Sequence, residues 1–174
     1  MNRWYYDFEF LEDGRTIDPI SVGFVSFDGS ITYYAGCAES DLNRAALDPW
    51  MRDNVLKKLP PRRADSKFWR PRSVIAQDIL GVLGIVRGEA RLGVPELWAD
   101  HASYDHVALC QLYGRMIDLP SGMPYYSMDL QQLLVSMGRR RSELPRQDPD
   151  LEHHALEDAL HLRRCHRWAL GLEE

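Results

Sequence analysis

Two acidic residues interrupt an aromatic segment near the start of the chain, and this segment limits what the chain can fold into. Residues 4–10 read Trp-Tyr-Tyr-Asp-Phe-Glu-Phe, a composition typical of a buried β-strand. Side chains two positions apart on a strand share one face, so Asp7 and Glu9 should lie close together. Their mutual repulsion is unfavourable unless a proton or a cation compensates it. The segment therefore predicts a core strand that carries a site for a divalent cation.

A second acidic signature lies near the other end of the sequence, where residues 153–158 read His-His-Ala-Leu-Glu-Asp. His154 and Asp158 are four positions apart and share one face of an expected helix. His153 can meet Asp158 only if it sits at or just before the helix start, so periodicity alone favours His154. Together with the first carboxylate pair, this signature predicts a site that holds two metal ions and cuts phosphodiester bonds.

Length and composition favour one domain over residues 1–174. The chain has 174 residues, of which 45% are hydrophobic, enough for one core. No apolar run is long enough to span a bilayer, and the first strand leaves no room for a signal peptide, so we expect a cytoplasmic protein without membrane contact. Cys37, Cys110 and Cys165 have neither redox nor metal-ligand spacing, and we expect free thiols.

The charge of the chain limits how it can bind nucleic acid. Its formal net charge of -5 argues against a protein that coats nucleic acid through positive charge alone. Lys and Arg are nevertheless locally dense within residues 57–72 and 139–146. These stretches either hold a phosphate backbone or are solvated loops and helix faces, and the sequence leaves both interpretations open.

Turn signals near the start of the chain predict three antiparallel strands. Residues 12–14 and the Asp28-Gly29 pair are typical of tight turns between strands. The three strands are expected over residues 4–10, 20–27 and 31–34. A short strand over residues 96–99 should join them in the sheet.

Helical periodicity and capping signals place helices around this sheet. The Asp48-Pro49 pair should start a helix that runs through Leu59, and apolar residues from Val74 to Val86 indicate a longer one. The next helix should hold Asp105 in its first turn, where the macrodipole stabilises a carboxylate. Further helices are expected over residues 129–137 and across the second acidic signature, with a polar loop over residues 138–150 between them.

Three motifs, in this order, resemble those of the DEDD superfamily of 3'-to-5' exonucleases, in the subgroup with a catalytic histidine (DEDDh). Asp7 and Glu9 match the Asp-x-Glu motif on the first strand. Asp105 matches the aspartate early in a helix after a central strand, and only His153 with Asp158 fits the motif His-x-Ala-x-x-Asp. The resemblance covers nearly the whole chain. It implies an α/β, RNase H-like fold with a central mixed β-sheet, three antiparallel N-terminal strands and flanking helices.

Within this superfamily the chain looks closest to the bacterial RNase AS type, small exoribonucleases that trim adenylate-rich 3' ends and generally work as dimers. Residues 10–14, 55–60 and 104–112 carry this closer likeness. It implies a homodimer that acts on the 3' end of single-stranded or 3'-overhanging RNA and releases nucleoside 5'-monophosphates. DNA stays open as a substrate, because the sequence does not reveal how a 2'-hydroxyl would be recognised.

The resemblance also implies roles for the motif residues around two Mg2+ or Mn2+ ions. Asp7 would bridge the ions. Glu9 and Asp158 would bind the ion that holds the attacking water, and Asp105 would reach the other ion, mostly through water. His153 would be the general base. Because an imidazole has an unperturbed pKa of about 6.5, activity should rise with pH as the neutral form appears.

Substrate contacts follow from the same resemblance. Backbone and side-chain atoms of Phe10 and Leu11, just after the first motif, would grip the terminal nucleotide. Tyr104 is an aromatic candidate for stacking on a base. Core packing is the expected role of most other aromatic residues near the motifs.

Alternative functions stay open at this point. The chain could be a 3'-to-5' exodeoxyribonuclease, or a non-catalytic nucleic-acid-binding or scaffold protein of the same fold. A glycosidase that uses two carboxylates without metal would not need Asp105 and His153. His154 could be a surface histidine. Asp100 and His101 precede the second motif, where His101 would either contact substrate or cap the helix.

Overall fold

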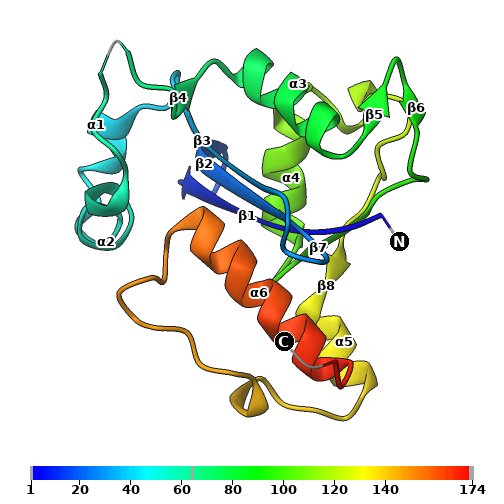
Figure 1. Ribbon diagram of the computed structural model, residues 1–174. Helices are drawn as coiled ribbons and strands as arrows, with labels where there is room; N and C mark the ends of the chain where they lie inside the picture. Colours follow the sequence, from blue (N-terminus) through cyan, green and yellow to red (C-terminus); the bar gives the residue numbers. More distant parts are fainter. Residues whose placement is uncertain (1, 64, 173–174) are drawn as a thin grey trace.

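The computed structural model describes residues 2–63 and 65–172. Met1, Ala64 and residues 173–174, which the expected domain of residues 1–174 includes, lie outside the described residues. A mixed sheet with the strand order β4-β3-β2-β1-β7-β8 forms the centre of the fold (Figure 1). Its strands are β1 (Arg3–Glu12), β2 (Ile17–Ser26), β3 (Thr32–Cys37), β4 (Trp69–Arg70), β7 (Glu96–Ala99) and β8 (Met128–Asp129).

The first three strands pair antiparallel, as the turn signals in the sequence predict. Strand β2 lies between β1 and β3, and both of its pairings are antiparallel. The pairings of β1 with β7, of β7 with β8 and of β3 with β4 are parallel. The expected α/β fold with a mixed central sheet and flanking helices is therefore confirmed.

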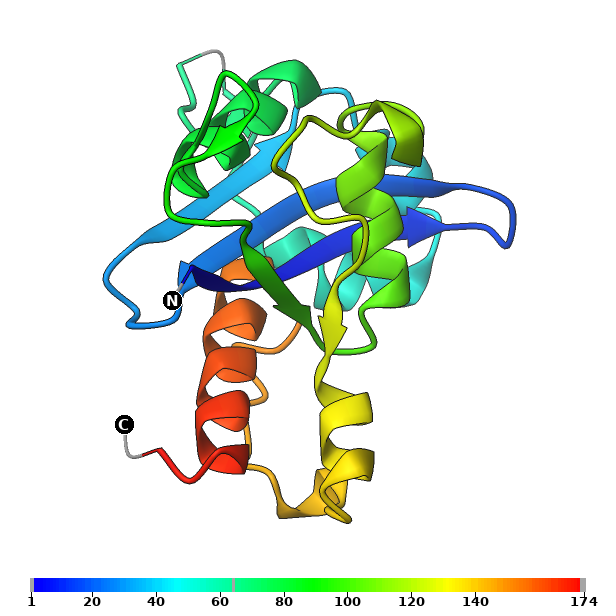
Figure 2. The ribbon, with the colours of Figure 1, turned by 90° about the vertical axis from the view of Figure 1, so that its right-hand side faces the viewer.

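Helices cover both faces of the sheet (Figures 1 and 2). Helix α6 (Ala155–Ala169) lies under β1 and β2 with α5 (Leu130–Ser136) beside it, while α3 (Arg72–Val82) and α4 (Ser103–Gln111) lie on the opposite face. The remaining elements are α1 (Leu42–Ala45), α2 (Pro49–Asn54), η1 (Leu56–Lys58), the hairpin of β5 (Ile85–Val86) and β6 (Glu89–Ala90), η2 (Met116–Asp118) and η3 (Arg141–Glu143).

Two expected helices end earlier than the sequence pattern predicts. Asp48 caps α2 as expected and accepts hydrogen bonds from two backbone amides, but α2 ends at Asn54 and the chain continues as the 3-10 turn η1 instead of an α-helix to Leu59. Residues before a proline are biased towards extended backbone, and Leu59 precedes Pro60. Helix α3 ends at Val82 and does not reach Val86.

The early end of α3 has a local cause. Gly84 has a φ of 72°, a left-handed conformation that ends the helix and redirects the chain. Ile85 and Val86 then form β5, so the apolar residues that continue the helical pattern belong to a hairpin. The second strand of that hairpin, β6, follows directly after β5.

Alternate residues of β1 pack into separate cores on the two faces of the sheet. Tyr5 belongs to the cluster with α5 and α6, whereas Tyr6 and Phe8 belong to the cluster with α3 and α4. A third cluster joins α1 and α2 to Leu11 and Ile20 of the sheet. The three cysteines are buried free thiols, as expected. Among residues 2–63 and 65–172, no helix is both long and apolar enough to cross a membrane.

Candidate active site

Strand β1 presents its two carboxylates to α6. Since Tyr5 packs against α6, the pleat places Asp7 and Glu9 on that same face. Asp7 pairs with Gly23 across the β1–β2 ladder and Glu9 pairs with Ser21, and the register shifts between Glu9 and Phe10. Glu9 is 8% exposed. The two carboxylates therefore lie between the sheet and the first turn of α6.

Asp105 approaches β1 from its other side. The short strand β7 pairs only with residues 3–5 of β1, which leaves the rest of that edge open beside α4. Asp105, in the first turn of α4 and 5% exposed, accepts a hydrogen bond from the Phe8 amide at 2.8 Å. Because Phe8 lies between Asp7 and Glu9, this bond fixes Asp105 next to both of them.

The start of α6 separates the two neighbouring histidines. His154 is the N-cap, where its Nδ1 accepts a 3.4 Å hydrogen bond from the Glu157 amide and its ring lies 4.4 Å from the Tyr34 ring. His153 precedes it with a φ of 61°. One ligand atom from each of Glu9, His153 and Asp158 lies within 4.8 Å of the other two. The structure thus brings His153 into the cluster, whereas the His154 side chain caps α6 and contacts Tyr34.

Two residues within 49–58 contact the turn at His153, where the backbone is strained. A non-glycine residue in the left-handed region costs about 1–3 kcal/mol and persists only where surrounding contacts hold it. The Trp50 ring lies edge-on to the His153 ring, with centroids 4.8 Å apart. The Lys58 ammonium donates a hydrogen bond to the carbonyl of Glu152, the residue before His153. Both contacts come from the α2–η1 segment.

Burial and crowding shift the carboxyl groups of this site towards their protonated forms. Burial, the charges of Asp158 and Asp105, and a hydrogen bond with Asp158 raise the pKa of Glu9 to about 8. Burial raises the pKa of Asp105 to about 7, although the hydrogen bond from the Phe8 amide acts to lower it.

The two other carboxyls shift in the same direction. Burial, followed by the charges of Asp105, Glu9 and Asp158, raises the pKa of Asp7 well above its usual range. Burial also raises the pKa of Asp158, opposed by a hydrogen bond from Gln147 and by His153. Protons or cations can compensate four carboxyls that resist ionising together, and the cluster of Glu9, His153 and Asp158 could hold a divalent cation.

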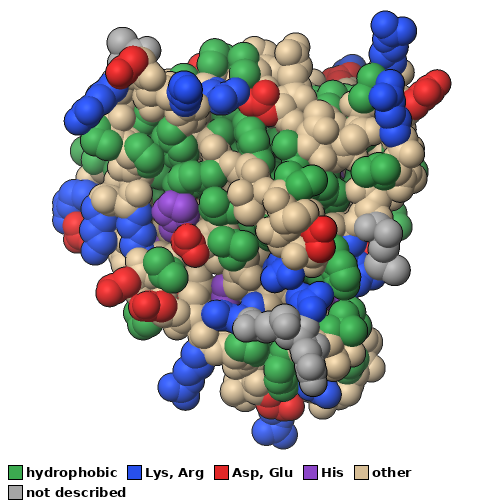
Figure 3. All heavy atoms as spheres, in the orientation of Figure 1, with side chains coloured by type: hydrophobic (Ala, Val, Ile, Leu, Met, Phe, Trp, Pro, Cys, Tyr) green, Lys and Arg blue, Asp and Glu red, His purple; other side chains and the backbone are tan. Residues whose placement is uncertain are grey.

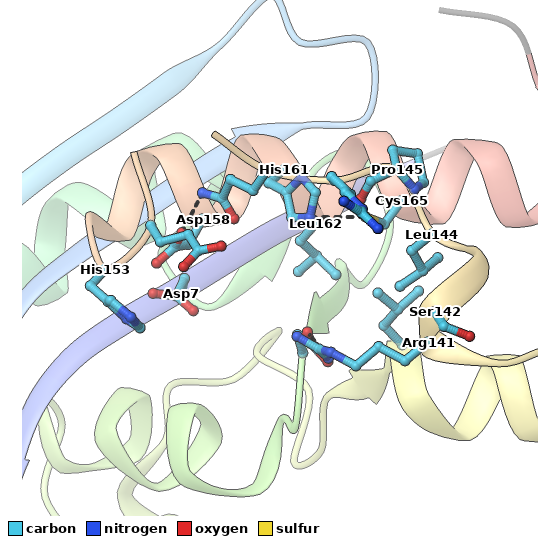
Figure 4. A pocket seen from close by; sticks show the side chains of 15 residues that line it. Asp7, Arg141, Ser142, Leu144, Pro145, His153, Asp158, His161, Leu162 and Cys165 are labelled. Atoms are coloured by element: carbon cyan, nitrogen blue, oxygen red, sulfur yellow. Dashed lines mark hydrogen bonds and ion pairs between the residues drawn. The ribbon is translucent and has the colours of Figure 1, made fainter. Parts of the chain in front are cut away.

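A cavity of about 460 Å3 adjoins the carboxylates, between α6 and residues 141–147 (Figure 4). Asp7, His153 and Asp158 lie at one end, and His161 and Cys165 lie further along α6. On the face shown in Figure 3, Lys and Arg side chains gather on the flank that carries α1 and α2 in Figure 1.

The expected substrate residues lie in two environments. The Phe10 and Tyr104 rings are stacked, with centroids 5.9 Å apart and planes 11° apart, and Tyr104 is 52% exposed. Leu11 is 8% exposed and its side chain packs with α1 and α2. The stacked pair can therefore offer an aromatic face to a ligand, whereas the Leu11 side chain belongs to the core.

The residues before the second motif have structural contacts. Asp100 accepts hydrogen bonds from Gln131 and Arg141, each at 2.6 Å. His101 is exposed and its Nδ1 lies 3.3 Å from Asp100. Ala102 is the N-cap of α4 and makes no side-chain capping bond, so the expectation that His101 could cap this helix is wrong.

Sequence reasoning missed several residues that shape the site. Trp50 and Lys58 contact the turn at His153, and Gln147 donates to Asp158. Gly23 lets α6 approach the sheet. These contacts join distant parts of the chain, and the local pattern around each residue carries no signal for them.

Comparison with known proteins supplies the reaction class. Residues 2–170 match the family described as the 3'-5' exoribonuclease Rv2179c-like domain. Two similar proteins, the 3'-5' exoribonucleases Rv2179c and MT2234.1 from two strains of Mycobacterium tuberculosis, are each 44% identical over 157 residues. These alignments cover 90% of this chain and 86% of each relative. A match of this extent, over a chain whose motif carboxylates and His153 converge, shows that the protein belongs to the 3'-5' exoribonuclease Rv2179c-like domain family of enzymes.

Proposed function

We propose that this protein is a metal-dependent 3'-to-5' exoribonuclease that removes nucleoside 5'-monophosphates from single-stranded or 3'-overhanging RNA. The observation that carries the proposal is the meeting of Glu9, His153 and Asp158 within 4.8 Å of one another. The half-buried Asp7 and the buried Asp105 adjoin the cluster, and the family supplies the reaction class.

Two Mg2+ or Mn2+ ions would be held by the four carboxylates, with Asp7 shared between them. Glu9 and Asp158 would serve the ion on the His153 side, and Asp105 the other. When bound, the ions would supply positive charge that favours ionised water and stabilises the leaving 3' oxygen. The raised carboxyl pKa values and the oxygen-rich donor set support this assignment.

His153 acts in this proposal as the general base. Its neutral imidazole accepts a proton from the attacking water while Trp50 and the Lys58–Glu152 bond limit its movement. The stacked Phe10 and Tyr104 rings are candidates for holding the terminal base, and the Leu11 backbone for holding its sugar. Lys and Arg side chains on the α1–α2 flank would hold the phosphate backbone.

The finer assignments rest on sequence resemblance. They are the RNase H-like fold of one domain, membership of the DEDDh subgroup nearest RNase AS, a preference for adenylate 3' ends, a homodimer and a cytoplasmic location. The mixed sheet, with three antiparallel strands followed by a parallel one, is compatible with that fold.

The test compares degradation of a 5'-labelled adenylate RNA and the matched DNA strand, with Mg2+, with Mn2+ and with chelator. His153→Asn and His154→Asn form a matched pair, since asparagine tolerates the left-handed backbone at position 153 and can cap α6 at position 154. A metal-dependent ladder that shortens from the 3' end and is lost only with His153→Asn supports the proposal. A chelator-resistant ladder, or a greater loss with His154→Asn, contradicts it.

A further inference from the structure

A glutamine outside the three motifs contacts one of the clustered carboxylates. The Gln147 amide nitrogen donates a 2.6 Å hydrogen bond to Asp158 Oδ1, which is the dashed line nearest Asp158 in Figure 4. Gln147 is half-buried and lies on the loop between η3 and α6. It lines the same cavity as Asp7 and His153. The bond therefore connects this loop to the candidate metal centre.

Helix α6 itself holds the loop in place. Arg164 donates a 3.1 Å hydrogen bond to the Arg146 carbonyl, and the Cys165 thiol lies 3.9 Å from the Pro145 carbonyl in a weak donor contact. Both side chains lie one to two turns beyond Asp158 on α6. Two successive carbonyls are thus held by the helix, and the next side chain along the loop, Gln147, reaches back to Asp158.

The chemistry of the bond suits a residue that orients a ligand. A carboxylate has two oxygens, and the donor on Oδ1 limits rotation of the group that faces Glu9 and His153. An amide is neutral, so it holds the carboxylate without the positive charge by which lysine or arginine would compete with a cation. Outer-shell partners of this kind commonly change metal affinity or activity by about 10–100-fold.

We infer that Gln147 is a positioning residue that holds Asp158 in the orientation needed for cation binding, and that it thereby sets the divalent-cation affinity of the Glu9–His153–Asp158 cluster. This inference rests on the proposed function. It adds to the three motifs a residue from a loop that they do not include.

The test replaces Gln147 with methionine, which keeps similar length but cannot donate. Gln131→Met is the matched control, because Gln131 makes the same type of bond, also at 2.6 Å, to Asp100, which is not part of the cluster. For each variant, Mn2+ affinity is measured by titration with electron paramagnetic resonance. The melting temperature without metal, and kcat and KM on adenylate RNA, are measured in parallel.

Gln147→Met should weaken Mn2+ binding about tenfold and lower kcat to a similar extent, with KM changed by less than about twofold. Gln131→Met should keep wild-type Mn2+ affinity. Equal Mn2+ affinity in Gln147→Met and wild type, or an equal loss in both variants, overturns the inference. If the wild-type protein binds no Mn2+ or cleaves no RNA, the proposed function fails instead, so the two failures are distinguishable.

Discussion

Leu156 rests directly on Gly23, because a β-carbon built at Gly23 would lie 2.4 Å from the Leu156 Cα and 2.4 Å from the Ala155 carbonyl oxygen. Gly23 is also the partner of Asp7 in the β1–β2 ladder. The first turn of α6, which leads into Asp158, is therefore seated on the residue beside Asp7. The absence of a side chain at position 23 sets how closely the two halves of the site approach.

Gly23→Ala should push α6 away from the sheet. Overpacking of a tight contact usually costs about 1–3 kcal/mol, and we expect that loss in the free energy of unfolding together with a lower kcat on RNA. Denaturant unfolding and RNA degradation measure the two effects. Gly81→Ala is the control, since Gly81 lies within α3 and a β-carbon there meets no atom within 4 Å. Wild-type stability in Gly23→Ala would contradict the close approach.

Trp50→Ala should reduce activity more than stability. The Trp50 side chain is 51% exposed, so its loss should cost roughly 1 kcal/mol or less of unfolding free energy. Without its ring the His153 imidazole gains freedom, and misplacement of a catalytic group by about 1 Å can cost up to a hundredfold in rate. We expect kcat to fall by about tenfold or more.

Leu47→Ala provides the comparison for Trp50, because Leu47 is 82% exposed near the start of the same helix. This variant should keep wild-type kcat. Equal kcat in Trp50→Ala and Leu47→Ala would mean that the edge-on ring does not restrain His153.

The metal-free protein should lose stability as pH rises through neutrality. Glu9 and Asp105 have ordinary pKa values of 4.5 and 3.8, and in the folded protein these rise to about 8 and about 7. The folded state thus binds protons that the unfolded chain releases, and the stabilisation present at low pH is lost as pH rises through 7 and 8. On the proposed function, bound Mn2+ would replace those protons, so its stabilising effect should grow with pH.

Thermal unfolding at pH 6, 7 and 8, with chelator and with Mn2+, measures both trends. A double variant with Glu9→Gln and Asp105→Asn should show a flatter dependence on pH without metal. A metal-free melting temperature that rises from pH 6 to 8, or a Mn2+ effect independent of pH, would contradict the raised carboxyl pKa values.

His166 should make the free energy of unfolding fall as pH drops, the opposite of the trend expected from Glu9 and Asp105. It is 1% exposed, its Nδ1 lies 2.8 Å from the Tyr5 hydroxyl, and burial together with the charge of Arg3 lowers its pKa to about 4. Between its unfolded pKa of about 6.5 and pH 4 the unfolded chain takes up a proton that the folded state refuses. Stability should fall by about 3 kcal/mol as pH drops across this window.

Denaturant unfolding at several pH values from 7 to 4 measures this acid dependence. His166→Gln should flatten it, whereas His101→Asn, at a position where the side chain is 70% exposed, should not. An unchanged acid dependence in His166→Gln would show that other groups cause it.

Strand β1, with its two carboxylates, and the start of α2 could be predicted from the sequence because both depend on local patterns. The two-residue period of a strand is enough to put Asp7 and Glu9 on one face. Asp48 caps α2 by accepting hydrogen bonds from backbone amides two and three residues further along the chain. The end of α3 was missed because the apolar pattern continues past Gly84, whose positive φ outweighs it.

The choice between the two histidines illustrates what local reasoning lacks. Helical periodicity favours His154, yet His153 enters the cluster because its backbone is left-handed before the helix begins. That conformation is held by Trp50 and Lys58, which lie about a hundred positions earlier in the sequence. Gln147 was missed for the same reason, since its importance depends on a contact made through tertiary folding.

The bond from the Phe8 amide to Asp105 also bears on when the enzyme can act. Asp7 and Glu9 are made early in synthesis, Asp105 much later, and His153 and Asp158 later still. A growing chain on the ribosome therefore has no complete cluster until residue 158 has emerged and α6 has docked on the sheet. If RNA is cleaved at this cluster, as proposed, the nascent protein cannot attack the messenger that encodes it before its folding is finished.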